Sequence, residues 1–584
     1  MFKRLSKTLS LTIIAILFIG LITTATAVDW AEVKKTGNWT EVEKSVVPFN
    51  EAGIDSYQQS PFFDSKVAEG ELPEVEERLP EEPLVVKPTD EIGKYGGTFT
   101  LAGPRPHFAA VHHTLMDTTI KLNRYNPMNE TFANIIKDWE FSNSGKVLTL
   151  HLREGLKWSD GHPFTAEAFR FYYEDVAFNK EINPVTRTVL KPIEEVEVVD
   201  DYTFRYYFDK SYYSFAEGNL AAFRGQQGDA FLPAHYLKKY HKDYNENADQ
   251  LAKEEGYERW IELFGHYAQQ GAFIPEGVPT VGPWVKSNDT GDAIIFERNP
   301  YYWKVDPAGN QLPYMDKMIV KPWKQMETFV TMIISGDVDW AGWSTPLSEY
   351  PTIKSNEDQG NYDVWLGKQP KGNDSTFFLN QTPQDEELAK VFRKKKFRHA
   401  LSVAIDREEI NEVVFLGQGE PRQAAFNPST PGVTDDWSKA YIEYDPERAK
   451  KLLDEIDIVD KDNDGWRERY DGETLTITII VTEDYPFNVS TTELVKDYWQ
   501  DIGIKADMKV ISRSLFNERS AAGRYDATVW FIDNVGPNKV PITRGAWFTW
   551  QGWNLAGPDW GLWLNTDGED EEAVEPPQVV KDVY

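Results

Sequence analysis

The carboxyl-terminal third of the chain contains an alternation of helix and strand that determines the class of fold. A predicted helix begins at Asp445 and Pro446, which are typical of a helix N-cap and a first helical position. The run LTITIIV at residues 475–481 is typical of a buried strand, a second helix ends near Gly503, and another strand follows at 506–510. Two strands joined by a helix form a β-α-β crossover, which makes the strands parallel. With similar alternation earlier in the chain, the sequence predicts an α/β protein with mixed sheets.

The first 27 residues have the features of an export signal. A basic start precedes an apolar run at residues 9–22, and Ala25-Thr26-Ala27 has the A-x-A pattern of a cleavage site. The run is too short and too poorly flanked for a stable transmembrane anchor, although an uncleaved N-terminal anchor is the alternative. We therefore expect cleavage before Val28 and a periplasmic or otherwise extracytoplasmic protein.

Composition narrows the chemistry further. The sequence has no cysteine, which excludes disulfides, a thiolate nucleophile, Cys-type zinc sites and a lipid-modified Cys anchor. Its net charge of −32 repels nucleic acid and anionic lipid, and the basic stretch 390–398 reads as a helix face. The 584 residues, 41% of them apolar, suffice for two or three domains.

Aromatic residues make up 14% of the chain and include 20 Trp, more than a core needs. Their flat apolar faces and polar edges suit sugar rings or peptide side chains. Catalysis has less support, because the sequence contains no G-x-S-x-G, H-E-x-x-H or P-loop motif, and its nine His show no metal spacing.

Several stretches, taken in order, resemble the extracellular solute-binding proteins of peptide-type ABC importers, often called family 5. An acidic arm, LPEVEERLPEEPLVV, followed by GKYGGTFT, resembles a longer subgroup of the same family. The other matching stretches are LHLREGLKWSDGHPFTAEAFRFYYEDV (150–176), VGPWVKSND (281–289), AIIFERNPYYW (293–303), PYMDKMIVKPW (313–323), ISGDVDW (334–340), FRKKKFRHALSVAIDREEI (392–410) and YDPERAKKLL (444–453).

The resemblance implies a two-lobed periplasmic-binding-protein fold, type II-like, with an extra inserted domain and closure across a hinge. Family members continue past this point with a helix and returning strands, whereas this sequence stops after EPPQVVKDVY, so the closing elements are expected to be missing. The expected division is a signal peptide (1–27), an extended acidic arm (28–90), lobe one (91–104 and 206–378), an inserted domain (105–205) and lobe two (379–584).

The same resemblance implies a receptor that captures an oligopeptide-type ligand and delivers it to the membrane subunits of an ABC importer. We expect a monomer that requires no cofactor and is not an enzyme. Family frequency favours peptide slightly, and an oligosaccharide is the alternative because some relatives bind sugars with stacked aromatics. A secreted carbohydrate-active enzyme is the alternative from a different class.

The segment YDATVWFIDNVGP (525–537) resembles the family stretch whose Trp lines the ligand cleft and whose following Asp takes a peptide α-amino group. On that match, Trp530 stacks on ligand and Asp533 pairs with a cation. The spacing from Asp526 to Asp533 is shorter than usual, so a neutral-ligand acceptor is the alternative role for Asp533. Further candidates, each with packing as its alternative, are Trp340 and Trp343 after a predicted strand at 334–339, Phe378 beside Asn380, and Trp547 and Trp550.

The loop DKDNDGWRERYD (460–471) has the carboxylate and glycine spacing of an EF-hand calcium loop. Its flanks predict a helix before it and a strand after it, so it is not an EF-hand pair. The alternative is a solvated turn that uses Asp and Gly for their conformations. A structural calcium would be bound by Asp460, Asp462, Asp464, the Trp466 carbonyl, Glu468 and Asp471, whose short side chain should weaken binding.

Overall fold

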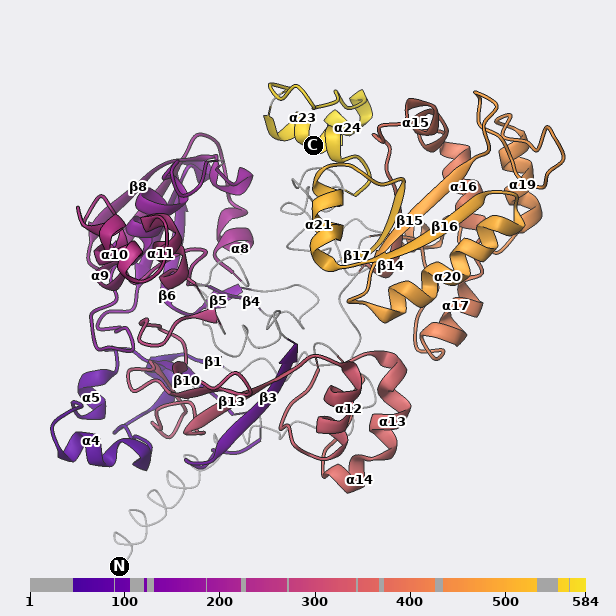
Figure 1. Ribbon diagram of the computed structural model, residues 1–584. Helices are drawn as coiled ribbons and strands as arrows, with labels where there is room; N and C mark the ends of the chain where they lie inside the picture. Colours follow the sequence, from indigo (N-terminus) through magenta and orange to yellow (C-terminus); the bar gives the residue numbers. More distant parts are fainter. Residues whose placement is uncertain are drawn as a thin grey trace, which may run out of the picture.

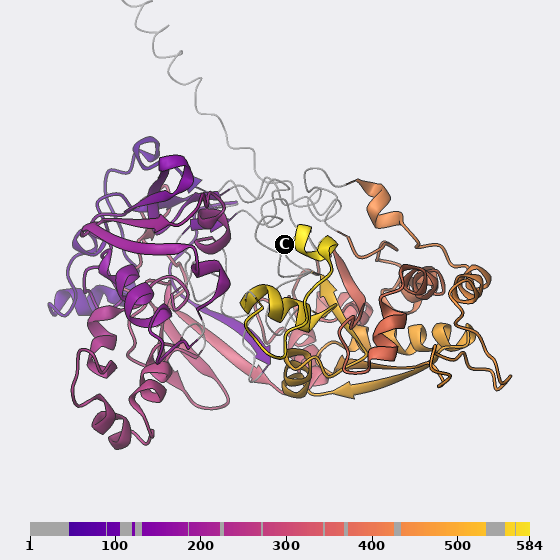
Figure 2. The same cartoon turned by 90° about the horizontal axis from the view of Figure 1, so that it is seen from above.

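The computed structural model shows two lobes side by side, one drawn from purple to pink and the other in orange (Figures 1 and 2). The predicted α/β class is confirmed, because mixed and antiparallel sheets pack with helices throughout. No helix among the described residues is long and apolar enough to cross a membrane. The described residues are 46–583 except 89, 105–119, 123–130, 185, 222–226, 270–272, 343–344, 367–371, 426–433, 533–554 and 567.

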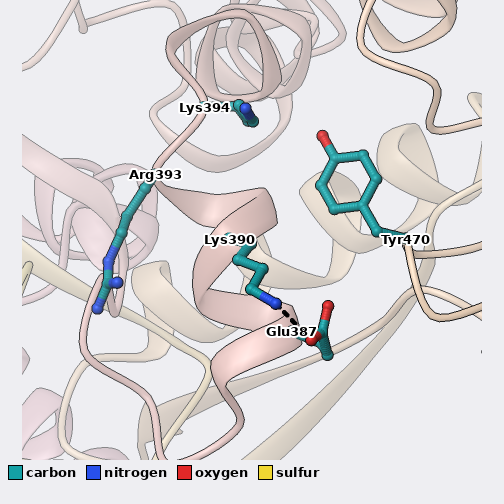
Figure 3. A pocket seen from close by; sticks show the side chains of 5 residues that line it. All are labelled: Glu387, Lys390, Arg393, Lys394 and Tyr470. Carbon is teal, nitrogen blue, oxygen red and sulfur yellow. Dashed lines mark hydrogen bonds and ion pairs between the residues drawn. The ribbon is translucent and has the colours of Figure 1, made fainter.

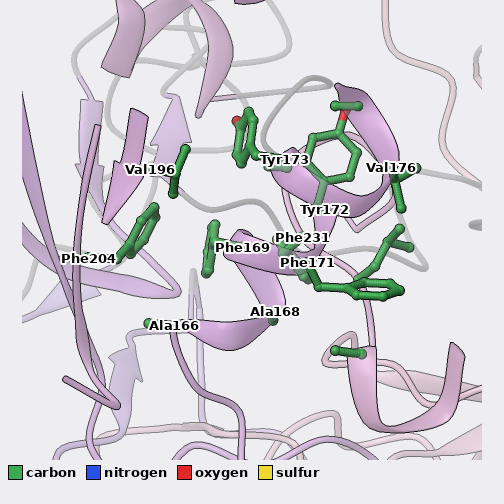
Figure 4. Close-up of a cluster of buried hydrophobic side chains, with 14 of the residues drawn as sticks. Ala166, Ala168, Phe169, Phe171, Tyr172, Tyr173, Val176, Val196, Phe204 and Phe231 are labelled. Atoms are coloured by element: carbon green, nitrogen blue, oxygen red, sulfur yellow. The ribbon is translucent and has the colours of Figure 1, made fainter. Parts of the chain in front are cut away.

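An antiparallel sheet with strand order β6-β7-β9-β8 carries the largest core of the first lobe. Phe204 on β9 stacks on Phe169 at 4.5 Å between ring centroids, and Phe231 packs against the same ring (Figure 4). The elements are β6 (Ile136–Ser142), β7 (Val147–Leu152), β8 (Ile193–Asp200), β9 (Thr203–Phe208), α7 (Glu167–Arg170) with a π-helical turn (Phe171–Ala177), α8 (Phe215–Asn219), α9 (Ala234–Leu237), α10 (Ala248–Glu254) and α11 (Trp260–Tyr267).

This core continues well past the domain boundary expected at residues 205 and 206. That boundary falls inside β9, and α8 to α11 bury Phe215, Leu237 and Trp260 in the same core as β7 and β9. The residues on both sides of the expected boundary therefore share one core. Its extent is set by which sheet the later helices cover, and helix periodicity does not carry that information.

A second sheet of the first lobe has strand order β10-β11-β13-β3, with β3 parallel to β13 and the other pairs antiparallel. Residues up to Ile334 form α12, so the strand expected at 334–339 is wrong; Phe329, Val330 and Ile333 bury a helical face there. The elements are β3 (Thr98–Pro104), β10 (Trp284–Asp289), β11 (Ile294–Arg298), β13 (Lys317–Trp323), α12 (Met326–Ile334), α13 (Tyr350–Ser355) and α14 (Glu357–Gly360).

The acidic arm is more structured than expected, because it adds strands and short helices to the first lobe. β2 pairs antiparallel with β1 and parallel with β12. The backbone N–H of Glu81 donates to the Glu154 carbonyl at 3.0 Å, and Arg153 donates to the Glu82 carbonyl at 2.9 Å. The elements are β1 (Val46–Val47), α3 (Phe49–Ala52), α4 (Asp64–Ala68), α5 (Val75–Arg78), β2 (Leu84–Val86) and β12 (Lys304–Val305); β4 (Ile120–Leu122) and β5 (Thr131–Ala133) form a separate ribbon.

The second lobe contains the predicted crossover. Its sheet has the order β14-β17-β15-β16, with β15 parallel to β16 and β17 and with β14 antiparallel at one edge. Asp445 caps α19 by accepting the Arg448 N–H, as its position in the sequence predicts. The elements are β14 (Asn373–Leu379), α15 (Glu386–Phe392), α16 (Lys395–Val403), α17 (Arg407–Val414), α18 (Asp435–Lys439), α19 (Pro446–Asp454), β15 (Thr476–Thr482), α20 (Pro486–Asp501), β16 (Lys505–Ile511), α21 (Arg513–Ala521), β17 (Ala527–Ile532), α23 (Pro558–Thr566) and α24 (Gln578–Val583).

The two faces of this sheet are covered by different helices. Ile479 belongs to the core that contains Trp499 of α20, while its neighbour Ile480 belongs to the core that contains Phe516 of α21. Successive residues of a strand point to opposite faces, so α20 and α21 lie on opposite sides of the sheet. Figure 1 shows α21 on the side of the second lobe that is nearer to the first lobe.

Candidate functional site

The carboxyl ends of three parallel strands meet at one edge of the second-lobe sheet. In open α/β sheets, ligands bind outside this edge. Asp484 and Tyr485 follow β15, Arg513 follows β16, and Trp530 lies in the carboxyl half of β17. The structure brings these four residues together, and we call them the edge cluster.

The indole of Trp530 is the centre of the edge cluster and is largely buried, with 6% of its surface exposed. Phe516 stacks on it at 5.1 Å between centroids, and Tyr485 meets it edge-on at 5.3 Å. Because these neighbours already cover the indole, the structure does not show Trp530 as the open stacking platform that the sequence predicted. Trp530 instead supports the residues around it.

Arg513 is the charged member of the edge cluster that lies against this aromatic surface. Its guanidinium carbon is 4.3 Å from the centroid of the Trp530 ring and 5.9 Å from that of Tyr485. Its Nη1 donates to Oδ2 of Asp484 at 3.3 Å. The side chains of Arg513 and Asp484 are 24% and 35% exposed, so the pair reaches solvent beside a buried indole.

Phe378 lies in the interior of the second lobe. It is 9% exposed and belongs to the same hydrophobic core as Trp530. Its neighbour Asn380 is fully buried and donates from Nδ2 to the carbonyls of Gly523 and Tyr525, each at 3.0 Å. The structure thus assigns this pair to packing, which was the alternative considered for Phe378.

Trp340 of the first lobe has the opposite environment, because 48% of its surface is exposed. It forms an isolated parallel bridge with Leu101 of β3, and the neighbouring Asp339 N–H donates to the Thr100 carbonyl at 2.8 Å. Asp339 also accepts the Thr100 N–H at 2.6 Å. Trp340 is therefore held beside the middle of β3, and its ring is accessible.

The remaining predicted ligand residues, Asp533, Trp343, Trp547 and Trp550, lie outside the described residues. Sequence reasoning missed Asp484, Tyr485 and Arg513. A signal for them was present, because each of these residues comes within four positions of the end of a predicted parallel strand.

A groove of about 480 Å³ lies elsewhere on the second lobe, along α15 (Figure 3). Glu387 and Lys390 form an ion pair of 2.5 Å in it, and Arg393, Lys394 and Tyr470 complete its lining. None of the predicted ligand residues lines this groove. Because its lining is mostly long charged side chains with partners on the same helix, the strand edge is the better candidate for a ligand site.

The loop at 460–471 lies between α19 and β15, which confirms the helix-loop-strand arrangement. Carboxylate oxygens of Asp460, Asp462 and Asp464 lie within 4.8 Å of one another, and all three residues are exposed. Oδ2 of Asp460 accepts the Gly465 N–H at 3.0 Å.

The two later predicted ligands, Glu468 and Asp471, have different surroundings. Glu468 is buried and accepts the Lys461 N–H at 2.8 Å, so its carboxylate faces into the loop. Asp471, expected as the last ligand, instead pairs with Arg469 at 2.8 Å, and Arg469 also binds Asp385. The carboxylate of Asp471 is thus already paired with a neighbouring cation, which it shares with Asp385.

The sequence matches a known family over most of its length. The profile of the bacterial extracellular solute-binding proteins, family 5, middle region, matches residues 131–550. The periplasmic alpha-galactoside-binding protein of Rhizobium meliloti is 26% identical over 80% of this chain and 69% of its own length. The oligopeptide-binding protein AppA of Bacillus subtilis is 23% identical over 70% of this chain and 66% of its own length.

Solved structures show the same two-lobed fold. A structure of an oligopeptide-binding protein OppA is 35% identical, with a TM-score of 0.66 over 91% of this chain and 85% of its own. The periplasmic binding protein MelB of Agrobacterium fabrum, solved in complex with stachyose, is 23% identical, with a TM-score of 0.70 over 91% of this chain and 80% of its own. These relatives are binding proteins.

Proposed function

The chain belongs to the bacterial extracellular solute-binding proteins of family 5, which makes it a solute-binding receptor of an ABC importer, and we propose that its ligand is an oligosaccharide of the α-galactoside type. The observation that carries this proposal is the match to an α-galactoside-binding protein over 80% of the chain. The edge cluster supports it, because an Arg–Asp pair beside aromatic rings suits a neutral molecule rich in hydroxyl groups.

An oligopeptide is the second candidate ligand. It is favoured by the solved structure of an oligopeptide-binding protein OppA, which is 35% identical and covers 91% of this chain. Peptide recognition would use backbone pairing in the manner of an added strand.

We further propose how the protein is exported and how it acts outside the cytoplasm. Residues 1–27 are a cleaved export signal, and the mature chain acts as a monomer without a lipid anchor and passes its ligand to the membrane subunits of the importer. It binds its ligand without chemical turnover. Incubation with the bound saccharide followed by mass analysis tests this point, since a changed saccharide would reveal an enzyme.

Isothermal titration of the mature chain separates the two ligand classes. The probes are raffinose and stachyose on one side and a mixture of tri- to pentapeptides on the other. We expect saturable binding of the α-galactosides with one site per chain. Saturable binding of the peptides and none of the saccharides would replace the proposal by its second candidate.

We also propose that calcium braces the loop at 460–471. Asp460, Asp462 and Asp464 would bind it with the Trp466 carbonyl, and buried Glu468 would take the place expected for Asp471. A ligand at about 100 times its Kd adds about 2.7 kcal/mol to the free energy of unfolding. Thermal melts with calcium and with chelator test this, and the Asp462→Ala variant should lose the shift; identical wild-type midpoints would instead identify a solvated turn.

A further inference from the structure

We infer that Arg513 and Asp484 of the edge cluster form a diol-binding subsite, which holds two neighbouring hydroxyl groups of a neutral sugar. This inference rests on the proposed oligosaccharide function and names the residues that would select the ligand. Sequence motifs of the chain did not point to either residue.

The placement of the two residues is the first support. Arg513 is the first residue of α21, directly after β16, and Asp484 lies just after β15. Both therefore project from the carboxyl edge of adjacent parallel strands, where ligands of α/β sheets bind. Their partial exposure contrasts with the burial of Trp530 beneath them.

The geometry of the guanidinium is the second support. Its central carbon lies over the Trp530 ring, at 4.3 Å from the ring centroid. Nη1 of the same guanidinium donates to Oδ2 of Asp484, so the ring contact and the ion pair together hold the group in place. A guanidinium carries five N–H donors, and the bond to Asp484 uses one of them.

The hydrogen-bonding pattern of the pair selects the chemistry of its ligand. A guanidinium only donates and a carboxylate only accepts, and here the two groups are held 3.3 Å apart. Of two neighbouring sugar hydroxyls, one can accept from Arg513 while the other donates to Asp484. The carboxylate of a peptide would gain less, because Asp484 already balances the positive charge and would repel a second anion.

A purely structural role is the competing explanation, in which the ion pair only covers Trp530. Exposed ion pairs contribute about 1 kcal/mol or less to stability. The two explanations are separable because Arg513→Met keeps an apolar stem over the indole and removes every donor. Asp484→Asn keeps the shape of the side chain and removes its charge.

Titration with stachyose tests the inference on the mature chain. We expect Arg513→Met and Asp484→Asn each to raise Kd at least about tenfold, which is the usual cost of losing a hydrogen bond to a charged group. Their melting temperatures should stay within about 2 °C of wild type, as for other surface substitutions. Arg519→Met, at the far end of α21, is the matched control and should change Kd less than about twofold.

Other results would overturn the subsite alone or the proposed function as well. Stachyose binding by wild type with unchanged Kd in Arg513→Met overturns the subsite and leaves the proposed function standing. A second result is that Arg513→Met lowers both the affinity and the melting temperature strongly, while Arg513→Lys keeps both at the wild-type values. That result would assign the pair to packing and would also overturn the subsite. If the wild-type protein binds only peptides, or binds neither saccharides nor peptides, the proposed function is overturned, and the subsite with it.

Discussion

Replacing Arg78 by Met should release the N-terminal arm from the first lobe. Arg78 ends α5 and is fully buried. It donates to the carbonyls of Pro73 at 3.1 Å and Pro300 at 2.5 Å, and to Oε1 of Gln311 at 3.3 Å; Gln59 accepts a further bond. Burial lowers the pKa of Arg78 to about 10, so it remains charged at neutral pH.

The expected cost follows from the groups that the substitution leaves behind. Met fills the space of the Arg stem but removes the donor to the Pro73 carbonyl and to the side-chain oxygens of Gln59 and Gln311, at about 1 to 3 kcal/mol for each group left unsatisfied. The Pro300 carbonyl keeps the bond from Nε2 of Gln311. The groups that accept from Arg78 are neutral, so the substitution leaves no unpaired charge, and relief of the desolvation of the guanidinium offsets part of the cost. We therefore expect a loss of about 3 kcal/mol, which raises the population of the open arm about 100-fold.

Limited proteolysis measures this population when opening and closing are fast compared with cleavage. Cleavage within residues 46–86 of the mature chain should accelerate about 100-fold in Arg78→Met, while calorimetry should show a smaller change in the main transition of the lobes. Arg259→Met is the control, because Arg259 is exposed and forms only a 3.3 Å ion pair with Glu262. Acceleration of less than about threefold in Arg78→Met would refute the view that this residue fastens the arm.

Three further predictions concern other parts of the chain. Burial raises the pKa of Asp559 to about 6, so its charge costs stability above that pH, and the cost disappears as the pH falls towards its usual pKa of 3.8. Asp559→Asn should therefore raise the free energy of unfolding at pH 7 by about 1 kcal/mol, given partial exposure, and raise the melting temperature with it, but should change neither at pH 4. Trp499 is 1% exposed and donates to the Leu401 carbonyl at 3.1 Å, so Trp499→Ala should cost about 3 to 5 kcal/mol in urea unfolding, and a loss below 1 kcal/mol would contradict this packing. Trp340→Ala should leave stability within about 0.5 kcal/mol because the ring is half exposed, but should weaken ligand binding in titration; unchanged affinity would remove Trp340 from the site.

Local patterns made much of the second lobe predictable. The cap at Asp445, the buried run at 475–481 and the stop near Gly503 are short-range signals, and together they predict the crossover that the structure contains. The helix-loop-strand reading of residues 460–471 depended on the same kind of signal. Each of these features is determined by residues that are neighbours in the sequence.

Features that depend on distant partners were not predictable in this way. Arg78 binds residues 222 and 233 positions away, so nothing in the arm itself indicates that its cation is buried. Trp530 is covered by Phe516 and Arg513 from a helix whose docking depends on the whole sheet. The family resemblance pointed to Trp530 as a residue of the ligand cleft, but it did not show whether the ring is open to a ligand.

The antiparallel direction of β14 has a consequence for how the lobes could move. Its first residue, Asn373, pairs with Ile532 at the end of β17, so the chain enters the second lobe at the same edge that carries the edge cluster. A pivot at this entry would lie close to the proposed ligand site. A small rotation would then leave the contacts at the edge cluster nearly unchanged, while the far rims of the two lobes, at the end of a longer lever arm, would travel much further.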